Sequence, residues 1–371
     1  MHSIERTFHP VGQGGFCSEK HVFDGRKFNI VYDCGNFGCK ARVANIAKKA
    51  FAVGENIDIL FVSHFDTDHV SLISSLIPYQ TCRIKKVVLP LLKYCEECDM
   101  MAGYYLAAAD GRARSALISS VDLIRDPDKF FPGTQIIYVD TAREGMLDEE
   151  ERDNLVRGDL HERRGLQLHR SLFGLDSPLN DWVFVPYNYD YLNRHMQLIV
   201  KLVRWLSTVK GSMSDLSDPG FVNKYRRELK GIYASAVMGG INENSMLLYS
   251  GPRDGDLRKY EVERDGKVVD ANVGCVYTGD VNLNVVNLNI VYAQYLNSVG
   301  VVQVPHHGSE LSFLGMHFPA TKRLCPVLYG QNNHYGHPAD EVGLRVTASG
   351  GLYKRVTEDP KTVFTERITM I

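Results

Sequence analysis

Four side chains of types that bind divalent metals stand within six positions of the segment SHFDTDH, residues 63–69. They are His64, Asp66, Asp68 and His69, and they follow the apolar run IDILFV. Imidazole nitrogens and carboxylate oxygens are common ligands of divalent cations, and a turn between a strand and a helix can present several of them to one point. A simpler interpretation is a polar turn in which an Asp caps the following helix. Four such residues together favour the metal site.

Three later segments carry further metal-binding or proton-transferring side chains next to predicted strands. CVYTGDVN contains Asp280, and VVQVPHHGSE contains His306 and His307. His334 and His337 lie in the loop YGQNNHYGHPAD. Each segment alone is weak evidence, because motif matches of this length are common and strand-end histidines often only form hydrogen bonds. Together with the first cluster, they predict a site assembled from distant parts of the chain, with a carboxylate that bridges two metals.

The elements that must position these residues divide the chain into three parts. Residues 4–92 alternate strand patterns with short helices, and strand patterns return from about residue 240. Between them, residues 93–235 are mostly helical or irregular and are interpreted as an insertion that serves as a lid or a partner surface. Two β-rich halves predict an α/β fold in which sheets pack as a sandwich with helices outside. We expect one domain over residues 1–371.

The composition limits the classes of function. The chain has 42 Lys and Arg against 44 Asp and Glu, a net charge of -2, which argues against a general nucleic-acid coat or a polybasic membrane anchor. No stretch approaches the roughly 20 apolar residues of a membrane span, and the N-terminus lacks the blocks of a secretory signal. Eight cysteines do not suggest a disulfide framework. We expect a reduced, cytoplasmic protein.

The order and identity of the motifs resemble those of the metallo-β-lactamase fold, and within it the soluble domain of ComEC-type competence proteins. The resemblance covers residues 4–92 and 240–371 and leaves the insertion unaccounted for. The matching segments are VGQGGF at 11–16, YDCG at 32–35, SHFDTDH at 63–69, NENSMLL at 242–248, TGD at 278–280, PHHGS at 305–309 and NHYGHP at 333–338. The resemblance implies an αββα sandwich with a large mixed insertion between its halves.

The resemblance also implies a set of metal ligands. One ion would be held by His64 and Asp66, with Asp280 bridging to a second ion. The second ion would be held by Asp68, His69, Asp280 and His307. We expect two divalent ions, zinc or manganese, because mixed His and Asp sites accept either.

Further residues receive supporting roles from the same resemblance. Asp33 and Asn244 would support the metal ligands, while Ser309 and His334 would bind substrate. The catalytic residues would be Asp68, His306 and His337, with His306 or His337 protonating the leaving oxygen.

The sequence departs from the family pattern in two informative places. Gly15 stands where the family has an Asp after Gly-Gln-Gly, and Asn244 occupies the region where many members of the fold place a third histidine. Gly15 removes any contact made by the family's Asp, and Asn244 implies a first metal that is held more weakly or completed by water.

These inferences predict a metal-dependent hydrolase that resembles phosphodiesterases and nucleases. Two ions would lower the pKa of a bridging water, and the resulting hydroxide would attack phosphorus in a phosphoester or nucleic-acid substrate. One alternative is an acyl hydrolase that opens lactones or lactams. The other is a metal-stabilised regulatory subunit without turnover.

Overall fold

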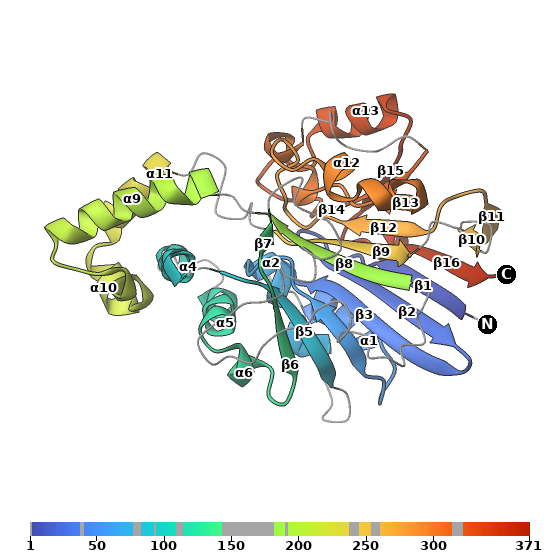
Figure 1. The fold of residues 1–371 in the computed structure, drawn as a ribbon, viewed down its shortest axis with the longest axis horizontal. Helices are drawn as coiled ribbons and strands as arrows, with labels where there is room; N and C mark the ends of the chain where they lie inside the picture. Colours follow the sequence, from blue (N-terminus) through green and yellow to red (C-terminus); the bar gives the residue numbers. More distant parts are fainter. Residues whose placement is uncertain are drawn as a thin grey trace.

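The structure is a computed structural model that describes residues 2–37, 41–76, 83–92, 94–108, 114–142, 182–189, 192–236, 245–253, 260–313 and 322–371. Asn244, which was predicted to support a metal ligand, lies outside these residues. The described part of the chain is a mixed α/β protein built on two mixed β-sheets (Figure 1).

The first sheet has nine strands, which pair in antiparallel fashion at one end of the sheet and in parallel at the other. Its strands, in spatial order, are β11 (Lys267–Val269), β10 (Tyr260–Arg264), β16 (Phe364–Met370), β1 (His2–Phe8), β2 (Phe16–Phe23), β3 (Arg26–Cys34), β4 (Ile57–Phe61), β5 (Ile84–Pro90) and β6 (Gln135–Val139). Pairing is parallel from β3 to β6 and antiparallel from β11 to β3. The C-terminal strand β16 pairs with β1, which joins the two ends of the chain within one sheet.

The second sheet has seven strands and is also mixed. Its order is β15 (Leu352–Val356), β14 (Leu324–Leu328), β13 (Val299–Val302), β12 (Gly274–Tyr277), β9 (Leu247–Pro252), β8 (Trp182–Tyr189) and β7 (Thr141–Ala142). Strands β12 to β15 are parallel, whereas β9 runs antiparallel to both β12 and β8. Parallel strands in both sheets therefore bring their carboxyl ends to defined edges, where loops can carry functional side chains.

Burial of both faces of the strands explains why their sequences are almost continuously apolar. In β3, Ile30 and Tyr32 belong to the core between the sheets, whereas Val31 packs on the helical side. Across the core, the rings of Tyr32 and Tyr277 stack with their centroids 5.0 Å apart. A strand buried on both faces needs apolar residues at nearly every position. The run IDILF, which precedes the predicted metal cluster, is β4 in this setting.

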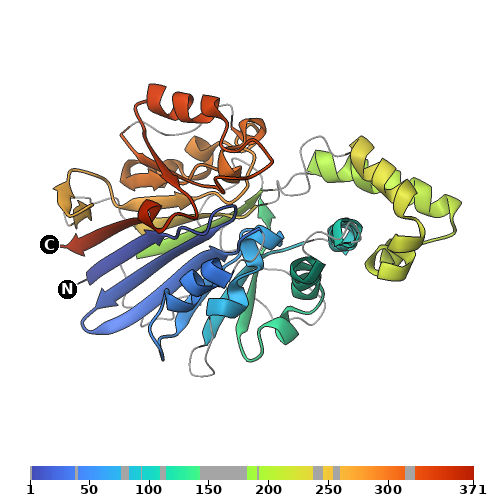
Figure 2. The same cartoon turned by 180° about the vertical axis from the view of Figure 1, so that it is seen from behind.

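Helices cover the outer faces of the sheets (Figures 1 and 2). The helices that pack beside the first sheet are α1 (Ala41–Lys49), α2 (Thr67–Val70), α3 (Ile73–Leu76), α5 (Arg114–Arg125) and α6 (Pro127–Phe130). Those beside the second sheet are α12 (Leu288–Val291) and α13 (Asp340–Ala348).

A helical lobe extends from this body on the side of α4 (Figures 1 and 2). We define it as α4 (Tyr94–Ala108), α9 (Leu192–Thr208), the short 3₁₀ helix η1 (Met213–Ser217), α10 (Pro219–Lys224) and α11 (Arg226–Ala236). These elements share a separate apolar core. These helices lie where the sequence shows helical patterns within the predicted insertion.

The stretch 93–235 is nevertheless not a single insertion in space. Strand β6 extends the first sheet beside β5, and β8 pairs with β9 in the second sheet. Sequence patterns missed β8, because Pro186 lies within it and proline is rare inside sheets. None of the helices in the described residues is both long enough and apolar enough to cross a membrane.

Candidate metal centre

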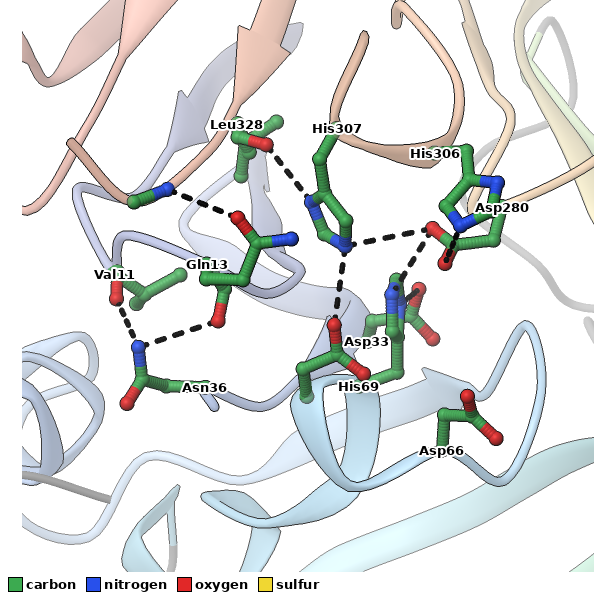
Figure 3. A network of polar contacts seen from close by, with 12 residues as sticks. Val11, Gln13, Asp33, Asn36, Asp66, His69, Asp280, His306, His307 and Leu328 are labelled. Carbon is green, nitrogen blue, oxygen red and sulfur yellow. Dashed lines mark hydrogen bonds and ion pairs between the residues drawn. The ribbon is translucent and has the colours of Figure 1, made fainter. Parts of the chain in front are cut away.

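The predicted metal ligands converge at the carboxyl ends of strands from both sheets (Figure 3). The 64–69 cluster follows β4, and Asp280 follows β12. His306 and His307 lie in η5 (His306–Gly308), which follows β13. Ligand sites of α/β proteins favour this edge, because loops from several parallel strands meet there.

Asp280 lies at the middle of four histidines, and its two carboxylate oxygens divide them into pairs. Its Oδ1 lies 3.2 Å from Nε2 of His69 and 3.7 Å from Nε2 of His307. Its Oδ2 lies 3.8 Å from Nε2 of His64 and 3.6 Å from Nε2 of His306. Each oxygen of this carboxylate therefore has two imidazole nitrogens beside it, as a bridging ligand would, and His69 also lies within reach of His64.

Hydrogen bonds on the far side of two rings fix which nitrogen carries the proton. Nδ1 of His69 lies 2.8 Å from Oδ2 of Asp33, and Nδ1 of His307 lies 2.9 Å from the carbonyl oxygen of Leu328. A carboxylate and a carbonyl can only accept, so both Nδ1 atoms donate. When a metal replaces the proton on Nε2, each ring would direct the lone pair of Nε2 to the centre, as metal-binding histidines do.

His64 is held in the same way by two serines. Its Nδ1 lies 2.8 Å from Oγ of Ser63 and 3.0 Å from Oγ of Ser245. Ser63 already donates its proton to Asp33, at 2.7 Å, so the ring nitrogen is the donor toward Ser63. Asp33 thus contacts His69 directly and is linked to His64 through Ser63.

The polar atoms that face the middle of the site are better explained by a bound cation than by packing in a core without one. Nε2 of His64, Nε2 of His69 and Oδ1 of Asp280 are buried without a hydrogen-bond partner. An unprotonated nitrogen 3.2 Å from a carboxylate oxygen is repulsive unless a proton or a metal ion lies between them. Two groups have ligand atoms all within 4.8 Å of one another, namely His64, His69 and Asp280, and Asp68, His69 and His307. The donor set therefore fits divalent cations.

Asp68 and Asp66 differ in their surroundings. Oδ2 of Asp68 lies 3.1 Å from Nε2 of His307, which places Asp68 in the second group. Asp66 stays at the rim, with Oδ2 4.0 Å from Nε2 of His64, and its Oδ1 accepts a 2.6 Å hydrogen bond from the hydroxyl of Tyr104. Asp66 occupies the N-cap position of α2 but makes no side-chain cap hydrogen bond, so helix capping does not explain it.

The pKa values reflect this crowding of charge. Burial, followed by the nearby His69, lowers the pKa of His64 to about 3, which keeps its ring neutral. Burial alone would also lower the pKa of His69, but the carboxylates of Asp280 and Asp33 hold it well above 6.5. Burial and the neighbouring Asp68 raise the pKa of Asp66 to about 7. Without a metal, protons take the positions where cations are needed.

Backbone geometry brings the histidines and their supports together. Asp33, His306 and His307 have positive φ values of 56°, 49° and 53°, a conformation that non-glycine residues rarely adopt. Such residues cluster at functional sites, where the surrounding structure compensates for the strain.

Glycines permit the close approach of the loops. A Cβ on Gly35 would lie 2.4 Å from the backbone of Asp68, and one on Gly15 would lie 2.8 Å from Nδ1 of His69. The latter distance gives a physical reason for glycine at position 15, where the family that the motifs resemble has an Asp. A side chain there would displace the ring of His69 from Asp33.

The remaining predicted residues lie around this centre in different ways. The ring of His306 faces Asp280 and contacts Ser312, whose Oγ lies 2.7 Å from its Nδ1. Nε2 of His306 lies 3.6 Å from Oδ2 of Asp280, on the same side as His64, for which the sequence offered no further histidine. Ser309 is only 3% exposed, which leaves it little access to a substrate.

The two histidines of the later loop are more open. The ring of His337 packs edge-on to that of His306, with centroids 5.5 Å apart, and its Nδ1 is buried without a hydrogen-bond partner. Burial and the neighbouring His306 and His307 lower the pKa of His337 to about 4, so its ring is neutral near pH 7. His334 is exposed at a pocket beside the centre.

Sequence reasoning missed Tyr104, Ser63 and Ser245 as supports of the ligands. Ser63 directly precedes the metal cluster, and that adjacency was its only signal. Nothing in the sequence connects Tyr104, which comes from the helical lobe, with Asp66.

Comparison of the chain with protein-family models and with curated proteins gave no match. The interpretation of the site therefore depends on its own geometry and on the order of the motifs.

Proposed function

We propose that this chain is a metal-dependent phosphodiesterase of the metallo-β-lactamase fold, with two divalent ions, zinc or manganese, at the centre around Asp280. The observation that carries the proposal is the division of four histidines between the two oxygens of Asp280. Two sheets with a common core and helices on their outer faces are also what this fold requires.

The ligands would be distributed in two sets that share Asp280. His69, His307 and Asp68 would hold one ion beside Oδ1, and His64 and His306 would hold the other beside Oδ2. When bound, divalent ions act as Lewis acids that lower the pKa of water and neutralise charge on phosphate oxygens. Asp66, which the sequence predicts as a ligand, would complete the ligand set of the ion beside His64 from the rim of the site.

The protein's own groups determine how the centre works on a substrate. Asp33, Leu328 and the serines keep each Nε2 directed inward, so no reorientation is needed when substrate binds. His337 is neutral and half-buried beside His306, which suits it to hydrogen-bond a substrate oxygen better than to donate a proton as an imidazolium. This refines the proton-donor role predicted for it.

The test combines metal content with two substrates. Purified protein supplied with Zn²⁺ or Mn²⁺ should contain about two ions per chain by elemental analysis and hydrolyse bis-p-nitrophenyl phosphate. The double variant Asp68→Ala, His69→Ala should lose both properties. Hydrolysis of a lactone in preference to the phosphodiester would favour an acyl hydrolase. Stoichiometric metal without turnover of either substrate would favour the regulatory subunit.

A further inference from the structure

A pocket of about 690 Å³ opens beside the metal centre. Its wall includes Gln13, which Figure 3 shows between Asn36 and His307. Another part of the wall comes from the loop that follows β14 and contains Tyr335. This volume lies in the range of about 300–1,000 Å³ that small-molecule sites occupy.

Two large aromatic side chains are exposed at this pocket. Phe37 is 43% exposed and Tyr335 is 56% exposed. Their rings meet edge to face, with centroids 6.1 Å apart and planes at 82°. Aromatic rings that stay accessible at a pocket offer stacking surfaces for a planar ligand.

The polar groups of the pocket suit a neutral ligand that forms hydrogen bonds. Amides of Gln13 and Asn36 line it together with the carboxylate-bearing Glu358. Oε1 of Gln13 accepts a hydrogen bond from the backbone of Gly330 at 3.2 Å, which holds the amide in place. Among the described residues that line the pocket, none is Lys or Arg. The pocket is therefore poorly equipped to bind a phosphate but well equipped to bind a flat ring with donor and acceptor groups.

One loop connects this pocket with the metal centre. The side-chain oxygen of Asn333 accepts hydrogen bonds from the backbone N–H groups of Tyr335, at 3.0 Å, and His337, at 3.1 Å. The rings of Tyr335 and His337 lie 6.0 Å apart, and His337 in turn packs against His306. A ligand stacked on Tyr335 would therefore extend past His337 toward Asp280.

We propose that this pocket binds the nucleobase of a nucleotide whose phosphodiester lies at the metal centre. The inference rests on the proposed function and narrows it, because it selects nucleotide-containing phosphodiesters over simple phosphoesters. Stacking supplies most of the affinity for the base, and the side chains of Gln13 and Glu358 contact its edge.

The test measures base binding without metal or turnover. The full-length protein, in EDTA, is titrated against the fluorescent nucleoside 2-aminopurine riboside, whose emission is quenched on stacking. We expect saturable quenching that adenosine reverses and ribose does not. Tyr335→Ala and Phe37→Ala should each weaken binding by about tenfold, and Tyr335→Phe should restore it. Val268→Ala is the control, because Val268 is 65% exposed on β11, outside the pocket.

Absence of saturable quenching, or equal affinity in wild type and both alanine variants, would overturn the inference. The base pocket and the phosphodiesterase can be refuted independently of each other. Hydrolysis of bis-p-nitrophenyl phosphate without nucleoside binding would leave the phosphodiesterase and remove the base pocket. Nucleoside binding without any metal-dependent hydrolysis would retain the pocket and remove the phosphodiesterase.

Discussion

Replacement of Tyr104 by Phe tests whether the helical lobe supports the metal centre. Tyr104 belongs to α4, and its hydroxyl donates to Oδ1 of Asp66 at 2.6 Å. Burial and the carboxylate of Asp66 raise the pKa of Tyr104 well above 10, so the hydroxyl remains a donor near pH 7. The ring also belongs to the apolar core beside the first sheet, and Phe keeps that packing. The substitution therefore removes one hydrogen bond and little else.

The size of the effect depends on the charge of Asp66, which carries its full charge above the pKa of about 7 that burial and Asp68 give it. A hydrogen bond to a charged group contributes about 1.5–3 kcal/mol to stability. Loss of a group that orients a metal ligand typically weakens metal binding by about 10- to 100-fold, equivalent to about 1.4–2.7 kcal/mol. We expect Tyr104→Phe to weaken binding of at least one ion by about this factor.

Tyr233→Phe is a matched control from the same lobe. The hydroxyl of Tyr233 also donates to an aspartate, contacting both the side chain of Asp99 and its backbone oxygen, the latter at 2.7 Å. Both variants should lower the midpoint of urea unfolding, measured without metal, to a similar degree. Only Tyr104→Phe should lower the affinity for Zn²⁺ in competition with a chromophoric chelator. Equal metal affinity in wild type and both variants would refute a role for Tyr104 at the centre.

Three further predictions concern the bridge, a glycine contact and acid stability. Asp280→Asn should reduce bound metal from about two ions to fewer than one per chain, and retention of two ions by elemental analysis would contradict the bridging role. Gly15→Ala should cost about 1–3 kcal/mol, because its Cβ would lie 2.8 Å from Nδ1 of His69. Gly231→Ala, with no atom within 4 Å of the new Cβ in α11, should instead stabilise by about 0.5–1 kcal/mol in urea unfolding. Burial lowers the pKa of His9 from 6.5 to about 3. As the pH falls below 6.5, His9 is therefore protonated in the unfolded state before it is protonated in the folded state. The free energy of unfolding should then decrease by up to about 1.4 kcal/mol per pH unit. Replacement of His9 by Gln should flatten that slope, and an unchanged slope of urea midpoints against pH would contradict it.

The approximate position of the site could be predicted from the sequence, because strand ends are local features. The apolar run before His64 and the one before Asp280 each predict a buried strand, and polar residues directly after buried strands collect at sheet edges. The structure brings these residues together at the carboxyl ends of β4 and β12. Local patterns were sufficient for this level of detail.

The distribution of histidines around Asp280 could not be predicted from alternation. In an extended chain, consecutive side chains point to opposite sides, so only one of His306 and His307 would face the centre. Both residues have positive φ values, 49° and 53°, which breaks the alternation and turns both rings toward Asp280. Contacts that hold η5 in this conformation include hydrogen bonds of His306 with Gly279 and of His307 with Leu328, whose positions in the sequence are distant.

Hydrogen bonding distinguishes a metal site from a polar turn at residues 63–69. A polar turn would satisfy its own hydrogen bonds, and an Asp cap would accept from the backbone of α2. Here the N-cap residue Asp66 contacts Tyr104 instead, while Nε2 atoms of His64 and His69 remain buried without hydrogen-bond partners. Burial of unpaired polar atoms is unfavourable, and strained backbone at the same point adds to the cost. Both costs are offset when a cation binds, because metal binding then contributes to folding free energy. If the site binds metal as proposed, metal should therefore raise the free energy of unfolding of this protein.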